Sequence, residues 1–365
     1  MIKKVNLSLS IKGLTKIICI FALAVNLTGC TWTKTSAASG ASASTREVTD
    51  MSGRKVSIPK TVNKVLPLSS NSTVDIYTLA PDKLAGVSFA FNGNAKKYIK
   101  EKYQDLTVVG TTEKIDYETI LNIHPDLIVC SEEAKIGTAD EIQNKLNIPV
   151  VIVNSSLEDM DKMYTLLGEC LGEEERAKKL ADYSRSAMDN IKNMVKNIPE
   201  NEKVKVYYAE GTNWLQTDVS GNVHTQVLDM AGAKNVADVS EAKSASMASV
   251  SMEQVLSWNP DVIIEGASAA KGSMFSNVSK DASWSKINAV KNNKCYKIPA
   301  LPFNVVDRPP SSARILGIQW LGNLLYPQYV KIDITKEMKN FYQLFYDYKL
   351  TDEEVNTLLK NAVSK

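Results

Sequence analysis

The sequence predicts a two-lobed α/β protein in which two mostly parallel sheets are joined by one long helix. Short continuous apolar runs alternate with helical periods, an alternation typical of parallel sheets covered on both faces. One stretch also recurs. DYETILNIHPDLIV at 116–129 is matched by SMEQVLSWNPDVII at 251–264, 135 residues further on. The chain therefore contains the same sequence motif twice, once in each predicted lobe.

The N-terminus has the composition of a secretory signal. Four lysines precede Ile17 to Leu27, an apolar run of about 11 residues, too short for the roughly 20 that span a bilayer. Leu27-Thr28-Gly29-Cys30 follows and resembles a bacterial lipobox, which implies lipidation of Cys30. An ordinary signal peptide with an incidental cysteine is the alternative. We expect 1–29 to be the signal and 30–45, rich in Ser, Ala and Thr, to be a flexible tether on an extracytoplasmic, lipid-anchored protein.

The charge and the cysteine content limit which classes of protein the sequence can belong to. The chain has 43 basic and 41 acidic residues, and the leader holds four lysines and no acid, so 39 basic residues remain against 41 acidic ones. The sequence shows no basic patch of the kind that would indicate nucleic-acid binding. Beyond the signal and Cys30 the cysteines are three, with no close spacing, and we expect buried thiols rather than a disulfide framework.

The first lobe is predicted at 46–156 and holds five short apolar runs. Polar or helical segments separate them, and one such segment, 69–80, begins with serines and becomes helical. The runs are KVLPL (64–68), LAGVSF (84–89), VVG (108–110), LIVC (127–130) and PVVIV (149–153).

Connecting helices are predicted at 157–199. One helix covers 157–171, Gly172 interrupts it, and a second covers 173–198 with acids at its start and lysines toward its end, as the helix dipole favours. Pro199 ends it. The second lobe and terminal helices, 200–365, resume the alternation with VKVYYAEG (204–211), VIIEG (262–266) and KCYKIP (294–299), then helical periods at 311–326 and 334–362.

The recurring stretch reads as a helix, a turn and a buried strand. Tyr117, Ile120 and Leu121 have the i, i+3, i+4 spacing of one apolar face, and the second copy repeats it. Glu118 and Glu253 fall outside that face. A single copy would be an ordinary solvated acid, whereas two copies give equivalent outward-facing carboxylates, one in each lobe.

These features resemble the bacterial ABC-transporter substrate-binding proteins whose lobes are joined by a single helix, the receptors for iron–siderophores, cobalamin and haem. The resemblance runs from about 46 to 345. It is carried by the lipobox, TDMSGRKVSIPKTVNKV, GTTEKIDYETILNIHPDLIV, LGEEERAKKLADY, SMEQVLSWNPDVII and PFNVVDRPPSSARILGIQWLGNLLYP. It implies a monomeric receptor, an ABC permease dimer with its ATPase as partner, and docking of Glu118 and Glu253 on arginines of the two permease subunits. Such rim charges steer encounter and fix register more than they add affinity.

The resemblance also implies a ligand cleft between the lobes, at the carboxyl ends of the parallel strands. Six loops are candidates to line it. They are Leu68 to Ser72, Phe89 to Asn94, Gly110 to Thr112, Tyr208 to Leu215, Ala245 to Ala248 and Phe303 to Arg308.

Two side chains in these loops are candidates for direct ligand contact. Trp214 lies in a polar loop without periodic apolar partners and is predicted to be an aromatic platform, with a structural lid residue as the alternative. Arg308 precedes Pro309-Pro310 and is predicted to grip an anionic group, since arginine binds carboxylates bidentately. A salt bridge to Asp307 or a capping role is the alternative. Weaker candidates are Tyr208 and Met247, which are ordinary core residue types, and Asn304 and Asn92, chosen by position alone.

A ferric siderophore is the ligand that we expect, because its chelator supplies the iron ligands and the protein needs only aromatic and cationic groups. Cobalamin, another corrinoid or haem are alternatives, and His224 is a candidate axial ligand for haem. The chain has two histidines, and His124 sits in the repeat, so a cage for bare zinc or manganese is not expected.

The sequence does not favour an enzyme. It contains no G-x-S-x-G, P-loop, G-x-G-x-x-G or H-E-x-x-H motif. No catalytic residue, resident metal or cofactor is predicted. A tethered enzyme or a structural surface lipoprotein remains the distant alternative.

Overall fold

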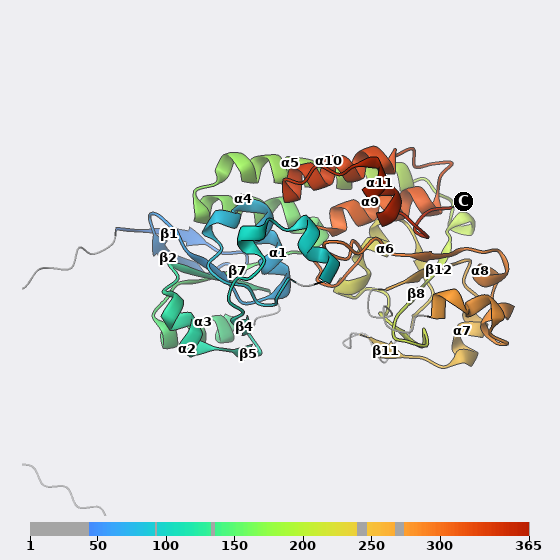
Figure 1. The fold of residues 1–365 in the computed structure, drawn as a ribbon, viewed down its shortest axis with the longest axis horizontal. Helices are drawn as coiled ribbons and strands as arrows, with labels where there is room; N and C mark the ends of the chain where they lie inside the picture. Colours follow the sequence, from blue (N-terminus) through green and yellow to red (C-terminus); the bar gives the residue numbers. More distant parts are fainter. Residues whose placement is uncertain (1–43, 92, 133–135, 239–246, 267–273, 365) are drawn as a thin grey trace, which may run out of the picture. The chain divides into compact units, whose positions relative to one another are not determined.

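Two parallel sheets, one in each lobe, organise the structure (Figure 1). The computed structural model describes residues 44–364, apart from 92, 133–135, 239–246 and 267–273. Cys30, the signal and Asn92 lie outside these residues. The relations given below fall within the unit Ala43–Lys365. Among the described helices, none combines the length and the apolar character needed to cross a membrane.

The first lobe contains a three-stranded sheet in the order β3-β6-β7, with all strands parallel. Leu66 pairs with Ile128, which pairs with Val150, and every residue of the three strands is buried. Continuous apolar runs are what a sheet covered on both faces requires. The strands are β3 (Val65–Pro67), β6 (Leu127–Ser131) and β7 (Val150–Val153).

Two further apolar runs of this lobe, 84–89 and 108–110, are predicted as strands but form only isolated residue pairs with the sheet or with each other. Val65 pairs with Leu84, and Val87 pairs with Val108. The remaining elements cover the sheet or form small hairpins. They are β1 (Thr45–Thr49), β2 (Lys55–Pro59), α1 (Ser70–Leu79), β4 (Gly110–Thr111), β5 (Lys114–Ile115), α2 (Tyr117–Ile123) and α3 (Ile136–Leu146).

The second lobe repeats this plan with a four-stranded parallel sheet in the order β10-β8-β12-β13. Its strands are β8 (Lys205–Ala209), β10 (Lys234–Asn235), β12 (Val262–Glu265) and β13 (Cys295–Lys297). Its remaining strands and short helices are β9 (Gln216–Thr217), β11 (Ala248–Ser249), α6 (Gln226–Met230), α7 (Met252–Trp258) and α8 (Asn288–Lys291).

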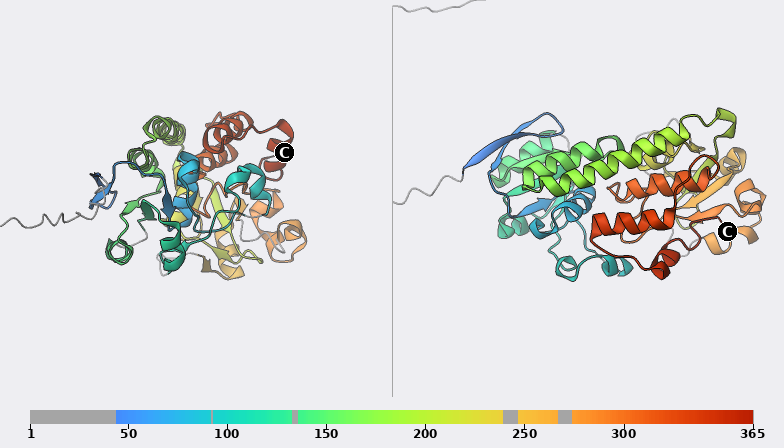
Figure 2. Two further views of the ribbon diagram at one scale, coloured as in Figure 1. Left: turned by 60° about the vertical axis from the view of Figure 1, so that its left-hand side comes forward. Right: turned by 90° about the horizontal axis from the view of Figure 1, so that it is seen from above.

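The lobes are bridged by α5 (Glu174–Val195), which follows α4 (Met160–Leu171). Its 22 residues span about 33 Å. The helix packs on α1 and α4 of the first lobe and on α6 of the second, and Figure 2 shows it running along both lobes. Gly168 of α4 lets the two long helices approach, because a Cβ there would lie 2.3 Å from that of Ala177.

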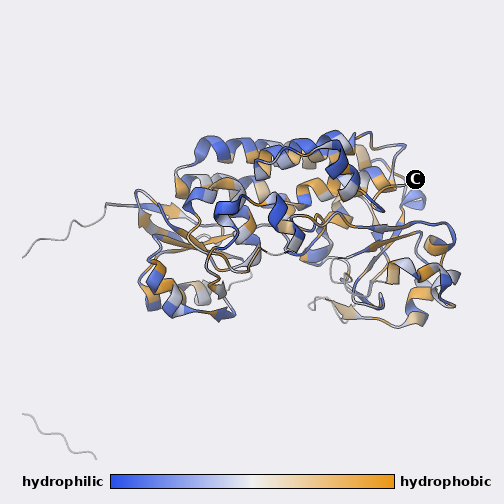
Figure 3. Ribbon diagram, viewed as in Figure 1, coloured by the Kyte–Doolittle hydropathy of each residue, from blue (hydrophilic) through white to orange (hydrophobic). Residues whose placement is uncertain are grey.

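Three C-terminal helices follow: α9 (Arg314–Leu325), α10 (Ile334–Tyr346) and α11 (Asp352–Leu358). Helix α9 packs on α5, α10 packs on α9, and α11 packs on α10. Helix α9 is apolar on all sides because α5, α6 and α10 pack around it. Hydrophobic residues concentrate along the strands and on the inward faces of the helices (Figure 3). One large apolar cluster runs through both lobes, and a smaller one completes each lobe.

Two sets of contacts join the lobes beside the bridging helix. The ring of Phe303 lies 6.4 Å from that of Phe89 and 6.0 Å from that of Phe91, measured between centroids. A buried polar network lies deeper. Asp75 of α1 accepts hydrogen bonds from the Ser155 hydroxyl at 2.8 Å and from the backbone N–H of Ser312 at 3.1 Å, just before α9.

The recurring stretch forms the same local structure twice. Asp116 caps α2 and Ser251 caps α7, and each side chain accepts from the backbone N–H three residues on. Both helices end in a left-handed residue, His124 in α2 and Asn259 in α7. The aspartate after the proline makes the same hydrogen bond in both copies. Asp126 accepts from the backbone N–H of Lys64, and Asp261 accepts from the backbone N–H of Lys205, which ties each turn to the neighbouring parallel strand.

Candidate ligand-binding cleft

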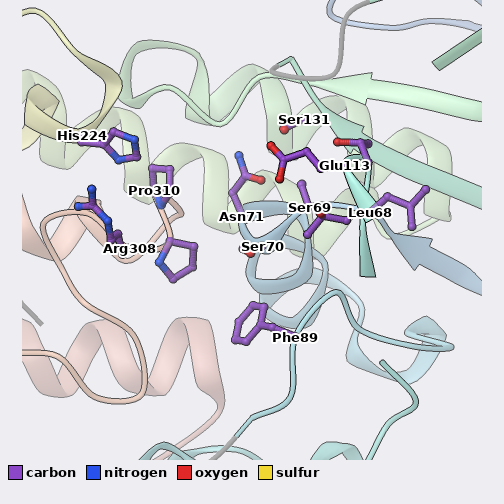
Figure 4. Close-up of a pocket in the computed structure, with 13 residues that line it drawn as sticks. Leu68, Ser69, Ser70, Asn71, Phe89, Glu113, Ser131, His224, Arg308 and Pro310 are labelled. Atoms are coloured by element: carbon purple, nitrogen blue, oxygen red, sulfur yellow. The ribbon is translucent and has the colours of Figure 1, made fainter. Parts of the chain in front are cut away.

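A cavity of about 470 Å³ lies between residues of the two lobes. Its first-lobe wall comes from the segment after β3, Phe89, the last residue of β6 and the β4–β5 hairpin, and its second-lobe wall comes from two loops (Figure 4). This is the carboxyl end of the parallel strands, where α/β sheets place their sites. The lining residues are Leu68, Ser69, Ser70, Asn71, Phe89, Thr111, Thr112, Glu113, Ser131, His224, Arg308, Pro309 and Pro310.

The first-lobe wall is the N-terminus of α1. Ser69 is its N-cap, and the hydroxyl accepts from the backbone N–H of Ser72 at 3.2 Å. Asn71 is 5% exposed, and its side-chain oxygen also accepts from Ser72, at 3.1 Å. The first turn of a helix carries the positive end of its dipole and backbone donors without intrahelical partners. This part of the wall therefore favours negative charge and supplies hydroxyl and amide hydrogen bonds, whereas the carboxylate of Glu113 borders the cavity from the β4–β5 hairpin.

Arg308 occupies the second-lobe wall. Its guanidinium donates to Glu210 at 2.8 Å and to Asp218 at 2.9 Å, and it also bonds Asp307. The three carboxylates are fully buried, whereas the arginine side chain is 28% exposed. Burial and the interaction with Asp218 raise the pKa of Glu210, although Arg308 opposes the rise. The arginine is thus both a cavity residue and the centre of a salt-bridge cluster, which includes the Asp307 pair given above as the alternative.

His224 completes this wall. Its Nδ1 forms a short hydrogen bond with Asp307, and its backbone N–H donates to Asn222 at 3.1 Å. A carboxylate on one imidazole nitrogen fixes the ring and its tautomer, as in proteins whose other nitrogen meets a metal. Nε2 is the nitrogen that Asp307 does not engage. The sequence placed His224 only at the rim of the cleft, because its pairing with a residue 83 positions away is not visible in local pattern.

Tyr208 and Met247 lie behind Arg308, outside the cavity lining. Tyr208 is fully buried on β8, and no described residue bonds its hydroxyl. Met247 approaches the cluster through its backbone N–H, which donates to Asp218 at 2.9 Å. Neither side chain borders the cavity, and the predicted lining loop Tyr208 to Leu215 instead supports the second-lobe wall through the bond of Glu210 to Arg308. Ala245 and Ser246 of the other predicted loop lie outside the described residues.

The prediction that Trp214 is an exposed aromatic platform is wrong. The indole is fully buried, and its N–H donates to Glu265 at 2.9 Å. Its ring packs edge-on against Trp284, with centroids 5.5 Å apart, in the core of the second lobe. Thr212 and Asn213 of this loop are exposed while Trp214 turns inward, which is closer to the alternative of a structural residue.

Asn304 is also not placed toward a ligand. It is 2% exposed, and its side-chain oxygen accepts from the backbone N–H groups of Val306 and Asp307 at 2.7 and 3.1 Å. Its role in the structure is to hold the turn that positions Asp307 and Arg308. Ser69, Asn71, Glu113 and Ser131 border the cavity without having been singled out individually, because small polar residues after strands are too common to be distinguished by sequence.

Glu118 and Glu253 occupy equivalent places. Each is the second residue of its helix, α2 or α7, and each is exposed. Both helices lie along the edge of the unit opposite α5 (Figure 1). The exposed Leu121 lies one turn after Glu118 on α2.

The fold and this interlobe cavity define a receptor of the solute-binding class. The sequence profile of the periplasmic binding protein family matches residues 66–301, and the chain belongs to this family. It is similar to the molybdate-binding protein MolA of Haemophilus influenzae, at 26% identity over 331 residues that cover 82% of this chain and 91% of that protein. It is also similar to the high-affinity heme uptake system protein IsdE of Staphylococcus aureus, at 26% identity over 262 residues, 69% of this chain and 79% of that one.

A solved structure with the same fold is the ABC transporter solute binding protein from Sulfurospirillum deleyianum. It superposes with a TM-score of 0.80 at 30% identity, covering 86% of this chain and 99% of that one. The chain is thus the substrate-binding component of an ABC importer, which works outside the cytoplasm with a permease and an ATPase and is not an enzyme.

Proposed function

We propose that this receptor captures an anionic metal complex, a ferric siderophore being the ligand class that the cavity supports best. The observation that carries the proposal is the cavity between the N-terminus of α1, which favours negative charge, and Arg308, whose partly exposed guanidinium can donate hydrogen bonds to an anionic group. Its volume of about 470 Å³ lies within the roughly 300–1,000 Å³ typical of sites for drug-sized ligands. A bare ion would leave most of that space unfilled.

A second candidate is a tetrahedral oxyanion such as molybdate. The chain is similar to a molybdate-binding protein over most of its length. The hydroxyls of Ser69, Ser70 and Thr112 beside a helix N-terminus are groups that bind oxyanions elsewhere. Closure of the lobes would be needed to fit so small a ligand.

Haem and corrinoids are further candidate ligands. A similar protein is named for haem uptake, and His224, oriented by Asp307, offers Nε2 as one axial ligand. The described residues lining the cavity include no second histidine, methionine or tyrosine for a haem iron. Ferric chelates therefore stand first.

The experiment is calorimetric titration of the purified protein with ferric siderophores of several chelate types, molybdate, haem and cobalamin. We expect one ferric chelate to bind saturably, and Arg308→Lys to weaken it, because lysine cannot keep the same fork of hydrogen bonds. Arg185→Lys is the matched control, since Arg185 is an exposed arginine of α5 paired with Asp161. Binding of molybdate alone would select the second candidate. If none of the four kinds of ligand bound, all of these ligand proposals would be rejected.

We further propose that Glu118 and Glu253 dock on two like permease subunits. Their identical helix position and exposure on one edge provide the repeated charge that a two-fold partner needs. Reversing both to arginine should abolish uptake and leave ligand affinity unchanged. Glu353→Arg is a close control, because Glu353 is also the exposed second residue of a seven-residue helix, α11. A loss of affinity together with uptake would contradict the docking assignment.

Anchoring through lipid on Cys30 also belongs to this proposal. Support comes from the lipobox-like LTGC at 27–30 and from the Ser- and Ala-rich tether after it. Replacement of Cys30 by serine should release the receptor from the membrane fraction and abolish incorporation of labelled palmitate. Retention of the label would show that lipid is attached elsewhere.

A further inference from the structure

A cluster of buried charges lies directly behind the second-lobe wall of the cavity. It contains three carboxylates, one guanidinium and one imidazole. Asp218, His224 and Asp307 each offer a ligand atom, and these atoms lie within 4.8 Å of one another. All three come from the second lobe, on separate segments, so their arrangement does not depend on closure of the cleft.

The charges of this cluster do not balance. Glu210, Asp218 and Asp307 are fully buried and share a single guanidinium, that of Arg308. Excess buried charge is costly unless a partner or a proton compensates it. Protonation of Glu210 removes one negative charge, in keeping with its raised pKa. A divalent cation would instead balance all three ionised carboxylates together with the arginine.

A separate observation points to a missing partner at the same place. The hydroxyl of Tyr208 is fully buried and has no hydrogen-bond partner among the described residues. Tyr208 and Glu210 are two positions apart on the β8 segment and share a face. A Cβ at Gly266 would lie 3.1 Å from Glu210 and 3.2 Å from the Tyr208 hydroxyl, so both side chains reach the same spot. Asp307 and Glu210 are the charged groups with the largest effect on the pKa of Tyr208, which burial and these acids raise.

We propose that Asp218, His224 and Asp307 bind one divalent transition-metal ion, with the Tyr208 hydroxyl beside it. One imidazole nitrogen with two carboxylate oxygens suits zinc, manganese or ferrous iron. Arg308 bonds the Oδ2 atoms of both aspartates, whereas Oδ1 of Asp307 faces the histidine. The ion would bind Nδ1 of the neutral imidazole, whose single proton would then lie on Nε2, and the hydrogen bond between Nδ1 and Asp307 would be replaced by a bond from each group to the ion.

This ion would act on the cavity next to it. With the ion bound, the positive charges of the ion and Arg308 would balance the three carboxylates, so the excess negative charge behind the cleft wall would be removed. The wall would then attract anions more strongly, a consequence that rests on the proposed function. The ion would be a resident part of the receptor and not the imported ligand.

The test uses metal alone, without any imported ligand. The purified protein is stripped with a chelator, and zinc or manganese is added in competition with a chromophoric chelator. We expect one ion per chain, with about tenfold or greater loss of affinity in His224→Asn and Asp218→Asn. His124→Asn is the matched control, because His124 is the other histidine, is exposed and has the left-handed conformation that asparagine occupies in the second repeat. Equal losses in both histidine variants, or none in either, would show an adventitious surface ion and overturn the proposal.

A second measurement on the unaltered protein guards against variants that fail to fold. One equivalent of cobalt(II) should give the visible absorption of an ion bound by nitrogen and oxygen ligands. Absence of that spectrum would also overturn the proposal. Because the metal titration contains no imported ligand, a negative result there does not bear on the proposed function. In the same way, a calorimetric titration in which no ligand binds does not bear on the metal site.

Discussion

Asp75 of α1 links the lobes and is predicted to make stability depend on pH. The side chain is fully buried, and it accepts from Ser155 in the first lobe and from Ser312 before α9. Burial raises the pKa of Asp75 from 3.8 to about 6, although these two hydrogen bonds and the charge of Arg314 act against the rise. Folding therefore favours the protonated carboxyl.

The sign of the effect follows from this direction. The contribution of a group with a raised pKa is fully present below its unfolded value and is lost as pH rises through the folded value. A rise from 3.8 to about 6 corresponds to about 3 kcal/mol, lost between pH 4 and pH 6. Asp75→Asn keeps the shape of the protonated acid, so at pH 7.5 the variant should be more stable than the parent by up to about 3 kcal/mol, and at pH 4 the two should be nearly equal.

Urea unfolding at intervals from pH 4 to pH 8 measures this difference directly. Asp105→Asn is the control, since the Asp105 side chain is 88% exposed and its replacement should change little at any pH. A stability difference between Asp75→Asn and the parent that stays constant with pH would refute the reasoning. So would a variant that becomes progressively less stable than the parent as pH rises.

Further predictions test packing. Gly317→Ala should destabilise the protein by about 2 kcal/mol or more in thermal unfolding, because its Cβ would lie 1.8 Å from the carbonyl oxygen of Val305; a fully stable variant would contradict this. Trp214→Phe removes the donor to buried Glu265 and should cost about 1–3 kcal/mol in urea unfolding, while calorimetry should find ligand affinity unchanged; weaker binding would return Trp214 to the site. The Cys130 thiol should resist Ellman's reagent in the native protein, since burial raises its pKa to about 12, and rapid labelling would show otherwise.

Much of the fold could be predicted because its determinants are local. Short-range patterns in the sequence predict the apolar strands, the repeat and the bridging helix with acidic residues in its first turn. Helix α5 occupies most of the predicted 173–198. The outward placement of Glu118 and Glu253 follows from spacing on one turn of helix. The run at 84–89 was harder, because whether an apolar run joins a sheet depends on what lies beside it.

The cleft was predicted less well, since facing a ligand is a property of tertiary structure. Loop position correctly indicated the segments around Ser69 and Arg308 as cavity walls. It gave no means of telling that Trp214 turns inward or that Asn304 holds a turn. The partnership of His224 with Asp307 joins residues 83 positions apart, and no local spacing encodes it.

The apolar cluster that runs through both lobes makes the lobes interdependent in folding. Its members extend from Val48 to Ala362, and α9 and α10 contribute to it beside α1 and α4. A fragment that ended before α9 would leave those apolar faces in water. The lobes should therefore melt together in one calorimetric transition and should not survive as separately expressed halves, although each has its own sheet.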